Sequence, residues 1–156
     1  MDKQKTCCFT GHRQIAAKDY DRLYGEVKKL IEKLNSENDV TVFIAGGALG
    51  FDTLAAKAVL EPKDVLDISL ILYLPCESQT HNWTKSAKEE YSDILRRCDG
   101  FRYISLGYTS GCMLKRNRAM VDSSAFCIAC KKRNYGGTAF TVNYACSAGL
   151  TVINLK

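Results

Sequence analysis

The sequence predicts an α/β fold: a Rossmann-like, doubly wound domain with a mainly parallel sheet of about six strands and helices on both faces. Strand-like and helix-like segments alternate along the whole chain, which is typical of a parallel sheet. Several strand-like segments are apolar at consecutive positions, as expected of strands covered on both faces. Glycine turns at residues 46–50 and 136–138 each connect a strand to a helix. The chain of 156 residues fits a single domain, residues 1–156.

Six strands are expected where short apolar runs are bounded by turn residues. The first run ends at Gly11 and the third at Pro75, and both residue types commonly close a strand. The expected strands are residues 6–10, 40–45, 68–74, 101–106, 125–130 and 150–155.

Helices are expected between the strands, because apolar residues recur there every three or four positions. The expected helices are residues 20–34, 52–60, 86–98, 113–123 and 138–148. Asp52 or Thr53 is expected to cap the second helix. Ser86 and Glu89 have the spacing of a capping box for the third helix. Gly149 is placed to end the last helix.

Composition restricts the class of protein and its partners. Hydrophobic residues make up 46% of the chain and charged residues 25%, which is ordinary for a soluble globular protein. The net charge of +5 suits an anionic ligand but falls short of the basic stripe of a dedicated nucleic-acid-binding protein. No run approaches the ~18 apolar residues of a membrane span. Residues 1–5 lead into the first strand without the apolar region of a signal peptide, so we expect a cytoplasmic protein without membrane contacts.

The eight cysteines are scattered along the chain and do not form a disulfide framework. Only Cys127 and Cys130 have Cys-x-x-Cys spacing, and both lie inside an apolar strand-like run. Neither of the two histidines is placed to complete a zinc site with them. We expect most cysteines to be small buried hydrophobes, with a redox or metal role as the minor alternative. No metal site and no cofactor are therefore expected.

The expected ligand site lies beyond the carboxyl ends of the strands, at the point where the strand order reverses. At a strand–glycine–helix junction, backbone N–H groups and the helix dipole favour an anion such as phosphate. The two glycine turns and the other strand ends should meet at this edge of the sheet. The expected ligand-binding residues are Gly11, His12, Arg13, Gly46, Gly47, Gly50, Asp52, Thr53, Arg116, Arg118, Gly136, Gly137 and Thr138.

The glycine turn at residues 46–50 does not match the common nucleotide motifs. It is not a Walker A loop, because no Gly-Lys-Ser/Thr follows, and it is not a strict Gly-x-Gly-x-x-Gly. Residues 71–75 also lack the acidic residue that binds ribose in dinucleotide-binding proteins. ATP hydrolysis and ordinary nicotinamide chemistry therefore lose support.

Four polar side chains near the expected site are candidates for ligand contacts, and three of them also have a structural interpretation. Arg13 is expected to bind a phosphate or carboxylate. His12 is either a general acid or hydrogen-bond donor to a ligand, or a structural turn residue. Arg118 and Asp122 are four residues apart on a helix, so they either form a solvated pair or contribute to the site. We favour the site for Arg118.

Together these segments resemble the YpsA-like family of bacterial proteins, within the SLOG superfamily. The resemblance spans nearly the whole chain, and its ordered set of motifs is specific. It rests on residues 8–13, 46–52 and 74–76, on Trp83, and on residues 111–122 and 136–145. The resemblance implies a Rossmann-like fold and a nucleotide or nucleotide derivative as the ligand.

The same superfamily holds the LOG phosphoribohydrolases, which cut the N-glycosidic bond of substrates similar to adenosine monophosphate, and DNA-processing protein A, which binds single-stranded DNA. The LOG enzymes pair an arginine on the helix before the penultimate strand with a glutamate after a glycine motif. The resemblance places that arginine at Arg116 or Arg118, but residues 141–144 contain no glutamate. Glycosidic hydrolysis commonly requires a carboxylate. The candidate catalytic residues are then Arg118, Asp52 and Asp122.

Three functions are consistent with the sequence. The first is a protein that binds or senses a nucleotide derivative similar to AMP or ADP-ribose. The second is a nucleotide N-glycosidase with a relocated carboxylate, so whether the chain is an enzyme stays open. The third is single-stranded DNA binding, against which the modest net charge and the few aromatic residues expected at the surface both count. The oligomeric state also stays open between a monomer and a homodimer.

Overall fold

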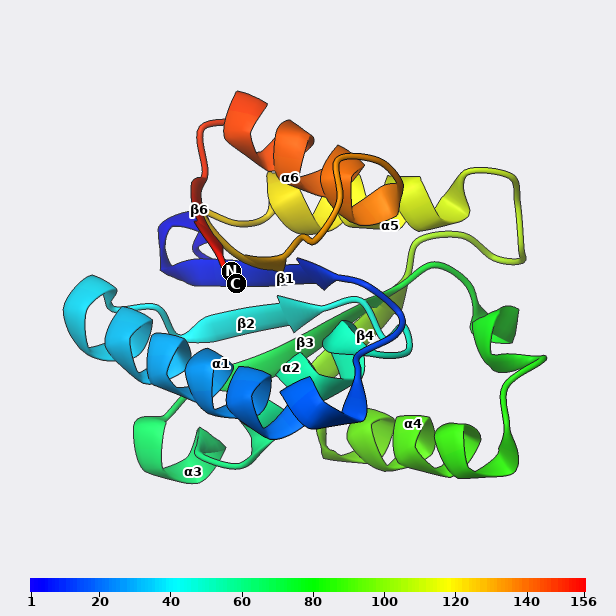
Figure 1. Ribbon diagram of the computed structural model, residues 1–156, viewed down its shortest axis with the longest axis horizontal. Coiled ribbons are helices and arrows are strands. Elements are labelled where there is room, and N and C mark those ends of the chain that lie inside the picture. Colours follow the sequence, from blue (N-terminus) through cyan, green and yellow to red (C-terminus); the bar gives the residue numbers. More distant parts are fainter.

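The computed structural model describes residues 1–156, and its six strands form one fully parallel sheet (Figure 1). The strand order is β4-β3-β2-β1-β5-β6, and each neighbouring pair is parallel. The strands are β1 (Thr6–Gly11), β2 (Val42–Ala45), β3 (Ser69–Leu74), β4 (Gly100–Tyr103), β5 (Phe126–Cys130) and β6 (Thr151–Asn154). The predicted doubly wound fold is confirmed.

The strand order of the sheet reverses at β1. Strands β2, β3 and β4 are added in order on one side of β1, whereas β5 and β6 lie on its other side. The register pairs Gly11 with Cys130, so β1 and β5 end side by side. The connections after these two strands run to opposite faces of the sheet, which opens a crevice between them.

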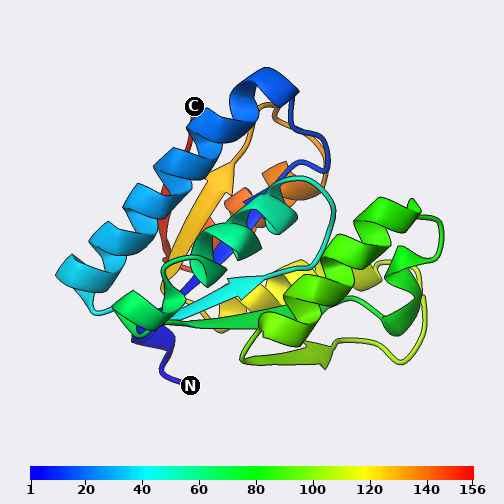
Figure 2. The ribbon, with the colours of Figure 1, turned by 90° about the horizontal axis from the view of Figure 1, so that it is seen from below.

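Helices cover both faces of the sheet (Figures 1 and 2). One face is covered by α1 (Ala17–Asn38), α2 (Phe51–Leu60), α4 (Lys85–Arg97) and the short α3 (Lys63–Leu66). The other face is covered by α5 (Cys112–Asp122) and α6 (Gly137–Ser147). Short 3-10 turns η1 (Lys3–Lys5) and η2 (Glu77–Thr80) complete the chain. Alternate strand residues enter the two cores, as Phe9 and Cys8 do, which explains why the strand sequences are apolar at consecutive positions.

The predicted N-cap of α2 is wrong. The N-cap is Gly50, and Asp52 and Thr53 lie within the first helical turn. Their side chains bond back to the preceding loop: the amide of Ala48 donates to Asp52 Oδ2 at 3.2 Å, and the Thr53 hydroxyl donates to the carbonyl of Ala48 at 3.0 Å. Both side chains therefore hold the glycine turn in place and leave the helix end uncapped by a side chain.

Two other boundary predictions gave mixed results. The helix predicted from Ser86 begins at Lys85, and its N-cap is Thr84, whose hydroxyl accepts the amide hydrogen of Ala87 at 3.1 Å. Ser86 is already helical, so the capping-box prediction is wrong. The C-cap of α6 is Ala148, one residue before the predicted Gly149. Gly149 follows it with φ 85°, and its amide donates to the carbonyl of Cys146 at 3.1 Å.

Six cysteines are buried, Cys98 is half-buried and Cys146 is exposed, so most of them are core residues as expected. All eight have free thiols. No helix combines the length and the apolar character that crossing a bilayer requires.

Gly50 holds the loop after β1 against the start of α2. Its φ is 77°, and a Cβ at this position would overlap the carbonyl group of Arg13. The amide of Phe51 donates to the carbonyl of His12 at 3.0 Å across the same contact. The close approach of the two backbones therefore requires glycine at this position.

We predict that Gly50→Ala lowers the free energy of unfolding by ~2 kcal/mol or more, since alanine in the left-handed region costs about 1–2 kcal/mol and the overlap adds to it. The matched control is Gly25→Ala on α1, where a Cβ has no neighbour within 4 Å. That change should raise stability by about 0.5–1 kcal/mol. Urea denaturation measures both, and changes of the same sign would contradict the packing described.

Candidate ligand-binding cleft

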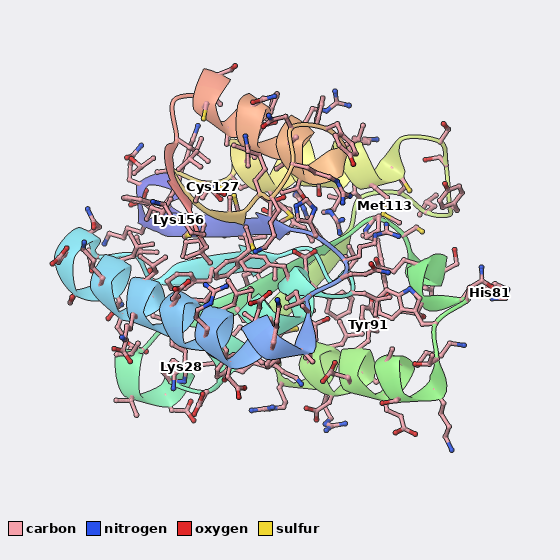
Figure 3. The ribbon with its side chains drawn as sticks, viewed as in Figure 1. Lys28, His81, Tyr91, Met113, Cys127 and Lys156 are labelled. Atoms are coloured by element: carbon pink, nitrogen blue, oxygen red, sulfur yellow. The ribbon has the colours of Figure 1, made fainter.

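A cleft of about 500 Å³ opens at the carboxyl ends of β1 and β5, where the strand order reverses. We call it the β1–β5 cleft. It is lined by Phe9, Thr10, Gly11, His12, Arg13, Gln14, Ala48, Asp52, Met113, Leu114, Arg116, Asn117, Lys132, Arg133, Gly137 and Thr138. Figure 3 labels Met113 at the start of α5, on the side of the molecule where these strands end. The end of β1, the loop before α2, the start of α5 and the second glycine turn meet here.

Arg116 is the buried cation of the cleft. Only 4% of the surface of Arg116 is exposed to solvent. Nη1 donates to the carbonyl of Gly46 and, at 3.5 Å, to that of Tyr73, while Nε donates to Asn117 Oδ1 at 2.7 Å. These bonds hold the guanidinium between the ends of β2 and β3. They leave Nη2 without a protein acceptor, so that nitrogen can donate to a ligand in the cleft.

Asp52 is the only carboxylate that lines the cleft. It is 8% exposed, and burial raises the pKa of its carboxyl, while the charge of Arg116 and the Ala48 amide oppose that rise. Burial likewise lowers the pKa of the Arg116 guanidinium, and Asp52 opposes that change. Gly46 lies between the two, because a Cβ there would stand 2.7 Å from both Arg116 Nη1 and Asp52 Oδ2.

The first glycine turn is packed against protein groups. A Cβ on Gly47 would overlap the side chain of Leu74, and Gly46 and Gly50 have the close neighbours described above. The amides of Ala48 and Phe51 already donate to Asp52 and His12. None of the three glycines lines the cleft, and Thr53 lines a separate hollow, so the structure does not bring these four predicted residues to the site.

The second glycine turn is open. Gly136 is the N-cap of α6, with φ 91° and no side-chain cap. A Cβ on Gly137 would have no neighbour within 4 Å, and Gly137 and Thr138 both line the cleft. The first-turn amides of a helix lack intrahelical acceptors and lie at the positive end of its dipole. This end of α6 therefore favours an anion.

His12 connects the end of β1 to the second glycine turn. Its Nε2 accepts the amide hydrogen of Lys132 at 2.9 Å, and its Nδ1 lies 3.5 Å from the hydroxyl of Thr138. Since Nε2 is an acceptor, the ring is neutral with its proton on Nδ1. Burial lowers the pKa of His12, and the charges of Arg133 and Lys132 lower it further. These bonds favour the structural interpretation of His12.

Two cationic residues of the cleft escaped the sequence prediction. Lys132 and Arg133 lie in the loop between β5 and α6 and line the cleft together with Arg13 and Arg116. The signal was present in the sequence as a basic run, residues 131–133, directly before the second glycine turn. Four cations against one carboxylate give the cleft a positive charge.

Arg118 and Asp122 do not line the cleft. Arg118 is exposed on α5, with its guanidinium 6.0 Å from the centre of the Phe140 ring. Asp122 is the last residue of α5, close to the start of β5 and so at the opposite edge of the sheet, where its carboxylate accepts a hydrogen bond from Tyr144 at 2.7 Å. Of the three candidate catalytic residues, only Asp52 is in the cleft.

The fold and this site define a Rossmann-like protein with a basic cleft at the topological switch point. The chain belongs to the YspA SLOG family, whose model (YpsA) matches residues 7–148. It is 28% identical to UPF0398 protein OB1025 of Oceanobacillus iheyensis in an alignment 142 residues long, which covers 86% of this chain and 77% of the relative. It is 30% identical to the uncharacterized SPbeta prophage-derived protein YoqJ of Bacillus subtilis in an alignment 138 residues long, which covers 80% of this chain and 78% of that protein.

The fold is also similar to a solved structure of DNA processing protein A from Helicobacter pylori. The TM-score is 0.70 at 17% sequence identity, and the match covers 99% of this chain and 66% of that one. At this level of identity the likeness concerns the fold. The resemblance to the SLOG superfamily inferred from the motifs is confirmed by the family match.

We predict that stability depends on pH through His12. An unfolded histidine has a pKa of about 6.5, and the folded value is lower, so the unfolded chain binds the proton more readily between the two values. The stabilisation by neutral His12 is complete above about pH 6.5 and is lost as the pH falls from there towards the folded pKa. Urea denaturation from about pH 5 to 7 should show this rise in stability with pH.

The chain offers a matched control for this measurement. His81 is its other histidine and lies exposed on the loop after η2, at the outer edge of the molecule in Figure 3. His12→Gln should flatten the pH dependence, and His81→Gln should leave it as in the wild type. Equal profiles for the two variants would show that the His12 contacts do not determine it.

Proposed function

We propose that the protein binds a nucleotide or nucleotide derivative in the β1–β5 cleft, through its phosphate. The observation that supports this most is the convergence of four cations and the open N-terminus of α6 on one cleft. A phosphate needs several donors with positive charge, and this arrangement supplies them from backbone and side chains.

The cleft offers different chemistry along its length. We assign the phosphate to the amides of Gly137 and Thr138 and the side chains of Lys132 and Arg133, which all line the cleft. Further in, the buried Asp52 carboxylate can accept hydrogen bonds from ribose hydroxyls. A ligand with a phosphate at one end and a sugar beside it matches this order of groups.

We predict that AMP, ADP, NAD or ADP-ribose raises the melting temperature. A ligand at ~100 times its dissociation constant adds about 2.7 kcal/mol to stability, which corresponds to a shift of roughly 5–10 °C in a domain of this size. Arg133→Ala should weaken binding about tenfold or more, because a hydrogen bond to a charged group contributes about 1.5–3 kcal/mol. The shift at the same ligand concentration would then fall to about half.

Arg118→Ala is the matched control. Both arginines are exposed and lie over an aromatic ring, Tyr135 for Arg133 and Phe140 for Arg118, but only Arg133 lines the cleft. Arg118→Ala should keep the full shift. Absence of a shift with every nucleotide would contradict nucleotide binding, and equal losses in both variants would contradict its assignment to this cleft.

Hydrolysis of an N-glycosidic bond is a second candidate function, and the position of Asp52 favours it. A buried carboxyl with a raised pKa beside a cation in a cleft is a common feature of catalytic sites. Asp52 would take a proton from the water that attacks the sugar carbon. The bond from this carbon to the base would break, and the same proton would pass from Asp52 to the base, so that neutral adenine leaves. Arg116, whose charge opposes the rise of the Asp52 pKa, would favour the carboxylate form that this step requires.

This candidate predicts release of adenine from AMP. Asp52→Asn should reduce the rate by about a hundredfold or more, the usual effect of losing a general base. Asp122→Asn should retain the rate of the wild type, because Asp122 lies at the opposite edge of the sheet. Chromatography of the products measures both, and a wild-type protein that binds AMP without releasing adenine would exclude hydrolysis of this substrate.

Single-stranded DNA is tested in the same melting experiment. Five aromatic residues are exposed, among them Tyr108 and Tyr135 at 71% each, so the expectation of few surface aromatics is wrong. The similar structure from Helicobacter pylori is described by its single-stranded DNA binding mode. A larger shift with an oligonucleotide than with any nucleotide, and a steep loss with salt, would favour DNA as the ligand.

A further inference from the structure

A second hollow lies next to the β1–β5 cleft, on the side of the sheet covered by α1, α2 and α4. Its volume is about 1040 Å³, and we call it the α1–α2 hollow. Its lining includes Ile15, Ala16, Tyr20, Leu49 and Thr53. Arg13 and Gln14 line both the hollow and the cleft, so the two spaces meet at these side chains.

The hollow differs from the cleft in its chemistry. Its walls include aliphatic side chains and the ring of Tyr20. The one lysine there, Lys57, is paired with Glu90, and the hydroxyl of Thr53 donates to a backbone carbonyl. Arg13 is therefore the only unpaired charge of the hollow. Such a lining suits a neutral group with an apolar face and a few hydroxyls, such as a sugar or a nucleoside, and is poorly suited to a phosphate.

Arg13 lies at the boundary between the two spaces. Its side chain is exposed and takes part in none of the ion pairs of the protein. Its backbone is held by the contact with Gly50 and by the bond from Phe51 to His12. Its guanidinium is free to bind two oxygens of one anion at this boundary. Because Arg13 lines both spaces, it suits the anionic part of a ligand that has one group in the cleft and another in the hollow.

We propose that the preferred ligand is a nucleoside diphosphate ester: one nucleotide lies in the cleft, Arg13 binds the diphosphate, and the neutral group on the far side of the diphosphate occupies the hollow. This inference rests on the proposed function, because it extends the same cleft. It narrows the ligand class to molecules with two parts, and a mononucleotide would fill only the cleft.

Calorimetric titration with AMP, ADP, ADP-ribose and NAD tests this proposal. In the wild type, ADP-ribose or NAD should bind about tenfold or more tighter than ADP, because the terminal group buries apolar surface in the hollow. Ala16→Trp fills the hollow at an exposed position that has no side-chain capping bond. This variant should lose that tenfold advantage and bind AMP within about twofold of the wild type.

Ala17→Trp is the matched control, since Ala17 is also exposed but does not line the hollow. It should bind all four ligands as the wild type does. Equal affinity of the wild type for ADP, ADP-ribose and NAD would overturn the two-part ligand and leave the proposed function intact. Equal weakening of AMP binding and ADP-ribose binding by Ala16→Trp would also overturn the two-part ligand and leave the proposed function intact. A wild type that binds none of the four would overturn the proposed function and this inference with it.

Discussion

The geometry of the cleft depends on one buried guanidinium, that of Arg116. It connects α5 to the ends of two strands, through the carbonyls of Gly46 and Tyr73. A buried cation is costly unless its donors are satisfied and a counter-charge is near, and Asp52 provides that charge from the first turn of α2. A side chain at position 46 would force one of these groups to move, because a Cβ there would stand 2.7 Å from both Arg116 Nη1 and Asp52 Oδ2. One interaction thus fixes three elements and gives the cleft its internal charge.

The two glycine turns have different roles because of what surrounds them. The first is filled by protein groups, and its amides donate to Asp52 and to the carbonyl of His12. The second has open space around Gly137 and is held from the side by the imidazole of His12. A rigid turn on one side and an open helix N-terminus on the other leave room for a ligand between them. The basic residues Lys132 and Arg133 then favour an anion in that room.

The alternation of apolar strands and amphipathic helices was sufficient to predict the fold, because each element buries a face that its own sequence displays. Helix caps were harder, since Asp52 bonds to the loop before its helix, a contact that depends on the folded turn. The glycines at 46–50 are predicted to bind a phosphate, because the sequence does not show what occupies the space beside them. In the structure that space holds protein groups, among them the side chain of Arg116. The sequence predicts both Arg116 and Arg118 at the site, but only Arg116 lines the cleft, because packing alone decides which face of α5 is buried.

The central claim is that a phosphate binds between the second glycine turn and the cations of the β1–β5 cleft. A crystal structure of the protein with AMP bound tests this claim most directly. We predict the phosphate within hydrogen-bonding distance of the amides of Gly137 and Thr138, with Lys132 or Arg133 beside it and the ribose towards Asp52. A phosphate bound at any other place on the protein, the first glycine turn included, would contradict the claim.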